Sequence, residues 1–267
     1  MTSPYGVDEI VDGDLVEVTV GDVAHGGHCV ARIGGAHGRV VFVRHALPGE
    51  RVIVEITEVH PRSYLRGDAI EILQAAPERV SPPCPYAGPG RCGGCDLQHV
   101  APDAQLTWKA SVVRGQLTRL SGLTEEQIDT LGVRVQALPG GPLGWRTRVR
   151  YAVDAQGRAG LLQHRSHQVV PIDRCRIAHP GIQALDITSR LWPDVDAVEA
   201  VASSGGDVTA LTRSTGGAAR PDDDLGAVRA QGAARVLVEG PATVRELVAG
   251  RMWQVPTEGF WQVHPAA

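Results

Sequence analysis

Apolar and polar residues alternate along the first part of the chain in a pattern that predicts a series of short β-strands. Glycine-rich turns separate these strands, and no helical period interrupts them. The strand-like segments are 15–20, 40–45, 51–59 and 69–73. Short strands joined by glycine turns predict a small antiparallel barrel or sandwich, for which an OB-like barrel is a common solution.

The pattern changes after residue 100. Residues 102–121 carry apolar residues at helical spacing, begin with proline and are followed by glycine, which predicts a helix. From residue 133 onward the alternation returns and predicts a second β-rich region, with a helix at about 180–192 and a polar break at 213–226. We therefore expect a mainly β chain with some α, in which a barrel is followed by an α+β domain.

The composition excludes several classes of protein. Hydrophobic residues make up 43% of the 267 residues and charged residues 21%, which excludes a disordered, collagen-like or coiled-coil chain. Aromatic residues make up 4%, so few rings can stack on bases, and the net charge of -4 gives no general affinity for polyanions. No apolar run approaches the ~20 residues that span a bilayer, and the N-terminus does not resemble a signal peptide. We expect a cytoplasmic protein without membrane contact.

The charge is distributed unevenly along the chain. Residues 1–78 hold 6 basic and 12 acidic residues, residues 79–190 hold 14 and 8, and residues 191–267 hold 6 and 10. The basic middle segment is a candidate for nucleic-acid contact, because arginines neutralise phosphates, and a solvated basic surface is the alternative. The acidic balance of the first segment favours a β-domain that does not bind RNA.

One predicted strand in the middle segment carries arginine at every second position. Arg146, Arg148 and Arg150 would lie on one face about 6.6 Å apart, a spacing at which they could meet successive phosphates. The other residues of this strand that we expect in the core are Trp145, Val149 and Tyr151. Like charges on one face repel one another, which favours a bound anion over a merely solvated surface.

Four of the five cysteines form a set that suits metal binding. Cys84, Cys92 and Cys95 lie in a loop rich in proline and glycine, Cys175 follows later, and Cys29 stands apart. Two thiolates spaced as in Cys-Gly-Gly-Cys can bend around one metal, and backbone N–H groups can point at a ligand sulfur. From the residues alone zinc is favoured over an iron–sulfur cluster, with reduced or redox-active thiols as a third reading.

Several segments, in order, resemble those of the bacterial uracil-5 RNA methyltransferases, which use S-adenosyl-L-methionine and carry an N-terminal TRAM barrel. The Cys-Gly-Gly-Cys-x-Leu-Gln-His core is the most specific of them, and Gln105 and Lys109 continue its pattern. The similar segments are 27–56, 79–100, 144–153, 165–175 and 259–267.

The resemblance implies cofactors and site residues. It implies a [4Fe-4S] cluster on Cys84, Cys92, Cys95 and Cys175, and contact of Gln262 with S-adenosyl-L-methionine. The family's reaction needs a thiolate that adds to uracil C6 and a base that removes the C5 proton, and no residue here matches either motif. Cys29 is interpreted as a small buried hydrophobe.

The resemblance also implies a domain plan, in which the Rossmann-like methyltransferase domain is absent beyond its first residues. The expected parts are a TRAM barrel (8–76), a cluster loop (77–101), a helix that packs on the catalytic domain (102–129), a central β-rich domain (130–252) and the start of the methyltransferase domain (253–267).

The expected function is methylation of uracil C5 in rRNA or tRNA. In this interpretation the chain is the RNA-binding and cluster-bearing portion, inactive alone, and the protein is a monomer when full length. The alternative is a non-catalytic RNA-binding protein with a structural zinc on the four cysteines.

Overall fold

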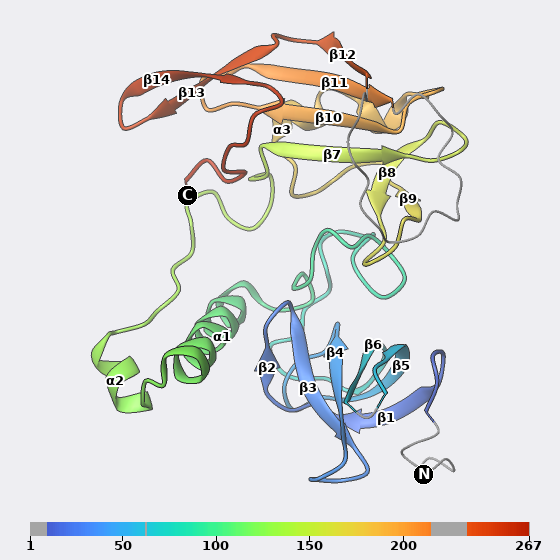
Figure 1. Ribbon diagram of the computed structural model, residues 1–267, viewed down its shortest axis with the longest axis vertical. Coiled ribbons are helices and arrows are strands. Elements are labelled where there is room, and N and C mark those ends of the chain that lie inside the picture. Colours follow the sequence, from blue (N-terminus) through green and yellow to red (C-terminus); the bar gives the residue numbers. More distant parts are fainter. Residues whose placement is uncertain (1–9, 62, 215–233, 267) are drawn as a thin grey trace. The chain divides into compact units, whose positions relative to one another are not determined.

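The N-terminal strands form one six-stranded sheet, with the order β1-β5-β6-β4-β3-β2 (Figure 1). The neighbouring strands are antiparallel, except that β4 and β6 are parallel. β1 also packs against β3, so the sheet curls around its core. The strands are β1 (Leu15–Thr19), β2 (Val23–Ala24), β3 (His28–Ile33), β4 (Arg39–Arg44), β5 (Arg51–Val59) and β6 (Tyr64–Gln74). The predicted strands are confirmed, but the expectation of a wholly antiparallel barrel is wrong because β4 and β6 pair in parallel.

We describe residues 10–61, 63–214 and 234–266 of this computed structural model. The chain divides into two units. The first comprises the residues up to Gly90 and Cys95–Ala137. The second comprises Arg91–Gly94 and the residues from Leu138 onward. Residues 8 and 9 of the expected barrel, and 215–226 of the expected polar break, lie outside the described residues.

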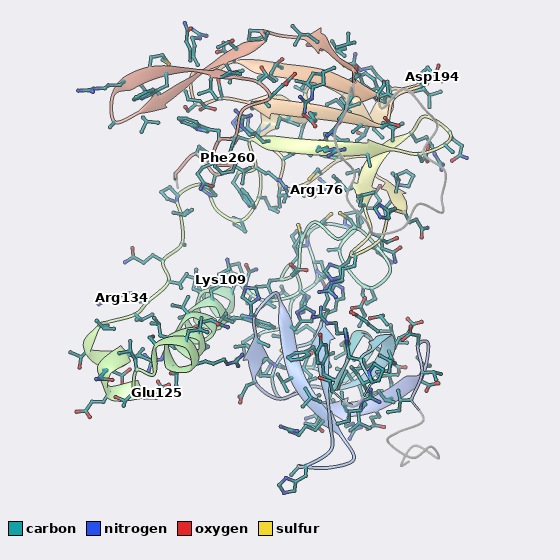
Figure 2. The ribbon with its side chains drawn as sticks, in the orientation of Figure 1. Lys109, Glu125, Arg134, Arg176, Asp194 and Phe260 are labelled. Carbon is teal, nitrogen blue, oxygen red and sulfur yellow. The ribbon has the colours of Figure 1, made fainter. Side chains whose placement is uncertain are left out.

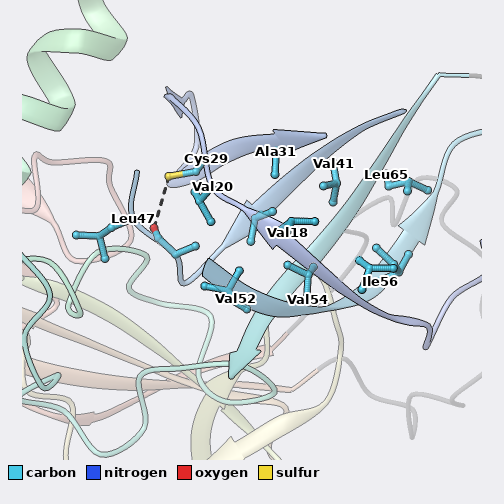
Figure 3. Packing of buried hydrophobic residues seen from close by; sticks show 14 of the residues in the cluster. Val18, Val20, Cys29, Ala31, Val41, Leu47, Val52, Val54, Ile56 and Leu65 are labelled. Carbon is cyan, nitrogen blue, oxygen red and sulfur yellow. Dashed lines mark hydrogen bonds between the residues drawn. The ribbon is translucent and has the colours of Figure 1, made fainter. Parts of the chain in front are cut away.

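The core of the first unit is built from alternate residues of the strands (Figure 3). Val52 and Val54 of β5 and Val41 of β4 are fully buried, as strict alternation requires. Cys29 is also fully buried, and its Sγ donates a hydrogen bond to the Ala46 carbonyl at 3.5 Å. Burial raises the pKa of the Cys29 thiol to about 12. The interpretation of Cys29 as a small buried hydrophobe is confirmed.

A buried ion pair ties the segment after the barrel to the turn before β5. The Glu50 carboxylate is fully buried and accepts hydrogen bonds from Arg79 Nε at 2.5 Å and Nη2 at 2.6 Å. It also accepts the backbone N–H groups of Leu47 at 2.8 Å and Ala76 at 3.1 Å. Burial raises the pKa of the Glu50 carboxyl, but these hydrogen bonds outweigh burial and hold it below its usual value.

The predicted helix is confirmed as α1 (Pro102–Ser121), which a left-handed Gly122 terminates. A short second helix, α2 (Glu125–Thr130), begins with a capping box at Thr124. In α1 only Trp108 is buried, and it packs into the barrel core. Most of the helix therefore remains exposed within its unit.

The second unit contains a six-stranded antiparallel sheet, ordered β12-β11-β10-β7-β8-β9, and a separate hairpin of β13 and β14. Its strands are β7 (Arg148–Val153), β8 (Ala159–Leu162), β9 (Val169–Pro171), β10 (Ala197–Ala202), β11 (Val208–Ser214), β12 (Ala234–Glu239), β13 (Thr243–Val248) and β14 (Arg251–Pro256).

The helix expected at 180–192 is wrong beyond its first turn. The structure has a short helix, α3 (Pro180–Gln183), and a 3-10 turn, η1 (Ile187–Ser189). Between them Asp186 has a left-handed φ of 50°, which a continuous right-handed helix cannot contain. No helix in the described ranges is long and apolar enough to cross a membrane.

Candidate functional site

The arginine strand of the sequence is β7, between β8 and β10 in the second sheet. Val149 and Tyr151 are buried, which confirms the predicted core face of this strand. Trp145 lies before the strand and is only partly buried, and its ring stacks on His264 with centroids 5.5 Å apart. The three arginines have different surroundings, so they do not form one open cationic face.

Arg148 binds the chain that follows the β13–β14 hairpin. Its Nη1 donates hydrogen bonds to the carbonyls of Thr257 at 2.9 Å and Gly259 at 2.8 Å, and its side chain is 15% exposed. Glu246 Oε1 lies 4.0 Å from Nη2. Burial lowers the pKa of the Arg148 guanidinium, and Glu246 raises it by less. Arg148 is thus an internal clamp in the structure, and the row of three cations that the alternation predicted is not present.

Arg146 and Arg150 have more open environments. Arg146 Nε donates to the Arg148 carbonyl at 3.1 Å, which holds the side chain along the chain toward Arg148. Arg150 has a side chain that is 58% exposed, with Glu199 of β10 opposite it at 3.9 Å. RNA contact by these residues stays a prediction, and Arg150 is the most accessible of the three.

Gln262 lies on a segment whose backbone is anchored at both ends. Thr147 donates to the Val263 carbonyl through its N–H at 2.8 Å and its Oγ1 at 3.0 Å. Arg148 holds the preceding carbonyls, so the path of the segment is fixed on either side of Gln262. The Gln262 side chain is exposed, and Phe260 is 86% exposed (Figure 2). Contact of Gln262 with S-adenosyl-L-methionine stays a prediction.

None of the four cysteines of the predicted metal set forms a disulfide. Cys84 and Cys95 belong to the first unit, and Cys92 and Cys175 belong to the second. Among the described residues, no group of three or more His, Cys, Asp or Glu side chains is placed to hold a metal ion. The donor chemistry of four thiols suits a thiolate-bound metal, and metal binding by this set stays a prediction.

The Cys-Gly-Gly-Cys loop packs closely on the β8–β9 hairpin. The Gly94 N–H donates to Cys92 Sγ at 3.4 Å, so a backbone N–H points at this sulfur as expected, and its role as a metal ligand stays a prediction. The Gly93 N–H donates to the Leu162 carbonyl, and a Cβ on Gly93 would lie 2.6 Å from the His164 backbone. Glycine is therefore required at residue 93 by close approach of two backbones, which the sequence did not reveal.

The Leu-Gln-His motif after the cysteines fastens its loop to the barrel. Gln98 Oε1 accepts the Cys84 N–H at 3.1 Å, and His99 is buried with Nε2 3.4 Å from the Ala46 carbonyl. Burial, with a smaller contribution from the Arg79 charge, lowers the pKa of His99 to about 4. The imidazole is therefore neutral at pH 7 and has a structural role.

The comparisons with known proteins agree with this fold. Residues 12–70 match the TRAM domain family, so the barrel of the first unit is a TRAM domain. Over nearly its whole length the chain is similar to RNA methyltransferases. It is 49% identical to an uncharacterized RNA methyltransferase of Streptomyces avermitilis over 96% of the chain, and 47% identical to one of Streptomyces coelicolor. The chain spans 61% and 58% of these two curated relatives.

A solved structure shares the fold. The Pyrococcus abyssi tRNA (uracil-54, C5)-methyltransferase, in complex with S-adenosyl-L-homocysteine, aligns with a TM-score of 0.56 and 16% identity. The alignment covers 93% of this chain and 62% of that protein.

The expectation that the methyltransferase domain is absent beyond its first residues is wrong. RNA methyltransferases align over 96% of the chain, and the solved methyltransferase aligns over 93%. The expectations that the catalytic domain is largely missing and that the chain is inactive alone are not supported either.

Proposed function

We propose that this protein methylates uracil at C5 in RNA, with S-adenosyl-L-methionine as the methyl donor. The observation that carries the proposal is the 49% identity to an RNA methyltransferase over 96% of the chain, together with the TRAM domain at 12–70. The solved protein of similar fold acts on uracil C5 and holds S-adenosyl-L-homocysteine, which is the donor after loss of its methyl group. The proposed base, carbon atom and methyl donor are taken from this solved protein of similar fold.

The chemistry of this reaction restricts which side chains can take part. Uracil C5 becomes nucleophilic enough to accept a methyl group only after a nucleophile adds to C6, and a base must then remove the C5 proton. Cys29 is excluded as the nucleophile because it is fully buried and its pKa is raised to about 12. We assign neither role to a described residue. For the methyl donor we propose contact with Gln262, whose amide is exposed on an anchored segment.

We further propose that Cys84, Cys92, Cys95 and Cys175 bind a [4Fe-4S] cluster. None of the four cysteines forms a disulfide, and the Gly94 N–H is aimed at Cys92 Sγ, which supports this, although the described side chains do not gather into a metal-binding group. No step of the proposed reaction passes through the cluster. Protein purified without oxygen should contain about four irons and four sulfides per chain. One equivalent of zinc and no iron would contradict the cluster.

Gene disruption tests the methylation directly. We expect RNA from cells that lack the gene to lose 5-methyluridine at one position of tRNA or rRNA, measured by mass spectrometry of digested nucleosides. The class of RNA that changes identifies the substrate, and a reintroduced gene should restore the modification. Unchanged 5-methyluridine in both RNA classes would contradict the proposed function.

A further inference from the structure

The hairpin of β13 and β14 carries apolar side chains on both faces of its tip. Leu247 and Met252 are paired on one face, and because successive residues alternate, Val248 and Trp253 lie on the other. All four side chains are 46% to 53% exposed, and we call them the hairpin tip. The turn of the hairpin points away from the six-stranded sheet of its unit (Figure 1). The tip is therefore an apolar projection that its own unit does not cover.

The tip is built on a well-fixed frame. The two strands pair in one register from end to end. The turn residues Ala249 and Gly250 have φ of 49° and 74°, the left-handed values that a two-residue hairpin turn requires. At the base of the hairpin, Ser204 Oγ donates to Glu246 Oε2 at 2.7 Å and accepts the Leu247 N–H at 2.7 Å. The shape of the tip is thus defined by the hairpin and its base.

The same frame holds the segment that carries Gln262. β14 ends at Pro256, six positions before Gln262. The Gly259 N–H donates to the Pro256 carbonyl at 2.8 Å, and the Gly259 carbonyl accepts Arg148 Nη1 at 2.8 Å. Glu246 of the hairpin lies 4.0 Å from the Arg148 guanidinium. The hairpin tip and the proposed donor contact therefore belong to one connected piece of the second unit.

The charge beside the tip is positive. Arg251, next to the turn, is exposed and makes no ion pair with any residue in the described ranges. Arg245 is paired with Asp207 at 2.7 Å. Glu246, the one acidic residue of β13 and β14, is buried and accepts hydrogen bonds from Ser204. A free cation beside exposed apolar side chains complements a polyanion that also offers flat apolar surfaces, which is the chemistry of RNA.

We propose that the hairpin tip opens the base stack of the RNA, with Trp253 against the base next to the target uridine and Arg251 on a phosphate. Apolar side chains that enter between bases unstack them, and enzymes that act on one base take it out of the stack. In the proposed reaction the nucleophile must reach C6 from above the uracil ring, where a stacked neighbour would block it. The inference rests on the proposed function and adds how the uridine becomes accessible.

The binding probe is a fluorescein-labelled RNA hairpin of about twenty nucleotides with one unpaired uridine in its stem, compared with the same hairpin fully paired. Unstacking costs least beside an unpaired base, so fluorescence anisotropy should show tighter binding of the probe by the wild type. Trp253→Ala should weaken binding of the probe about 5- to 150-fold, the range for loss of one base–aromatic contact. Trp253→Phe should retain most of the affinity, because a ring remains.

Methyl transfer gives a second measurement. On folded RNA from cells that lack the gene, Trp253→Ala should lower kcat/KM by a similar factor. The loss should be smaller on an oligonucleotide that carries an abasic nucleotide next to the target uridine, because no base stacks there. General damage to the fold would lower kcat/KM equally on both substrates.

Leu237→Ala is the matched control, because Leu237 is a half-exposed apolar residue of β12 outside the hairpin, and its loss should not change binding of the probe. Thermal unfolding checks the fold of each variant, and Met252→Ala repeats the test if Trp253→Ala does not fold. Equal affinity of the wild type and both tip variants for the probe would overturn the proposal. A dimer in sedimentation that Trp253→Ala abolishes would also overturn it, because a second copy would then cover the tip. If the wild type binds the probe as expected but transfers no methyl group, the proposed function fails and the role of the hairpin tip is supported.

Discussion

Replacing Glu50 with Gln should destabilise the TRAM barrel strongly. The carboxylate is fully buried and accepts four hydrogen bonds, two from Arg79 and two from backbone N–H groups. An amide of the same shape has one acceptor oxygen, and its NH2 group would face groups that are themselves donors. Arg79, whose side chain is 19% exposed, would also lose its counter-charge.

These losses define the expected magnitude. Removing one partner of a buried ion pair typically costs about 3–5 kcal/mol, because the other charge stays buried without compensation. A domain of ordinary stability has about 5–15 kcal/mol in total, so the barrel should open far more often in this variant. In the double variant E50Q/R79Q no charge is left unpaired, so we expect it to be less destabilised than the sum of the two single variants.

Hydrogen exchange measured by mass spectrometry at pH 7 reports on the barrel separately from the second unit, because β5 and β6 give their own peptides. The control is Glu17→Gln, which removes an exposed pair with Arg51 and should cost less than about 1 kcal/mol. If Glu50→Gln lowers the free energy of unfolding of the barrel no more than this control does, the buried Glu50–Arg79 pair does not stabilise the barrel as we infer.

The remaining predictions concern pH, the Arg148 clamp and the cysteine loop. The fold lowers the pKa of His99 from 6.5 to about 4. The contribution of the neutral imidazole to the free energy of unfolding should therefore be fully present above pH 6.5 and should fall as the pH drops toward 4, by up to about 1.4 kcal/mol per pH unit. In urea unfolding at a series of pH values, His99→Gln should show a weaker pH dependence over this range. Arg148→Gln should speed amide exchange in 257–263, whereas the exposed Arg150→Gln should not. Gly93→Ala should make the Cys92 loop more sensitive to protease, because its Cβ would meet the backbone of the β8–β9 hairpin.

The barrel could be predicted from the sequence because its strands alternate strictly between core and surface. Val16 and Val18 of β1 are buried and their neighbours are exposed, and this local pattern is sufficient to define a strand. The helix α1 was predictable for a similar reason, since proline and glycine mark its two ends. These signals are local in the chain.

The candidate site was less predictable because its contacts join distant parts of the sequence. Alternation places Arg148 on one face of β7, but the carbonyls that occupy it belong to residues 109 and 111 positions later. The pairing of Phe42 with Arg66 likewise depends on the parallel register of β4 and β6, which no local pattern defines.

The central claim is that methyl transfer occurs at C5 of uracil, and release of hydrogen from that carbon tests it most directly. RNA from cells without the gene is labelled with [5-³H]uridine and incubated with S-adenosyl-L-methionine and the protein purified as its gene encodes it. We predict that one tritium is released to water for each methyl group transferred, because the methyl group replaces the hydrogen on C5. Methyl incorporation without tritium release would place the modification at another atom, and the absence of both would contradict the assignment of this protein as a uracil-C5 RNA methyltransferase.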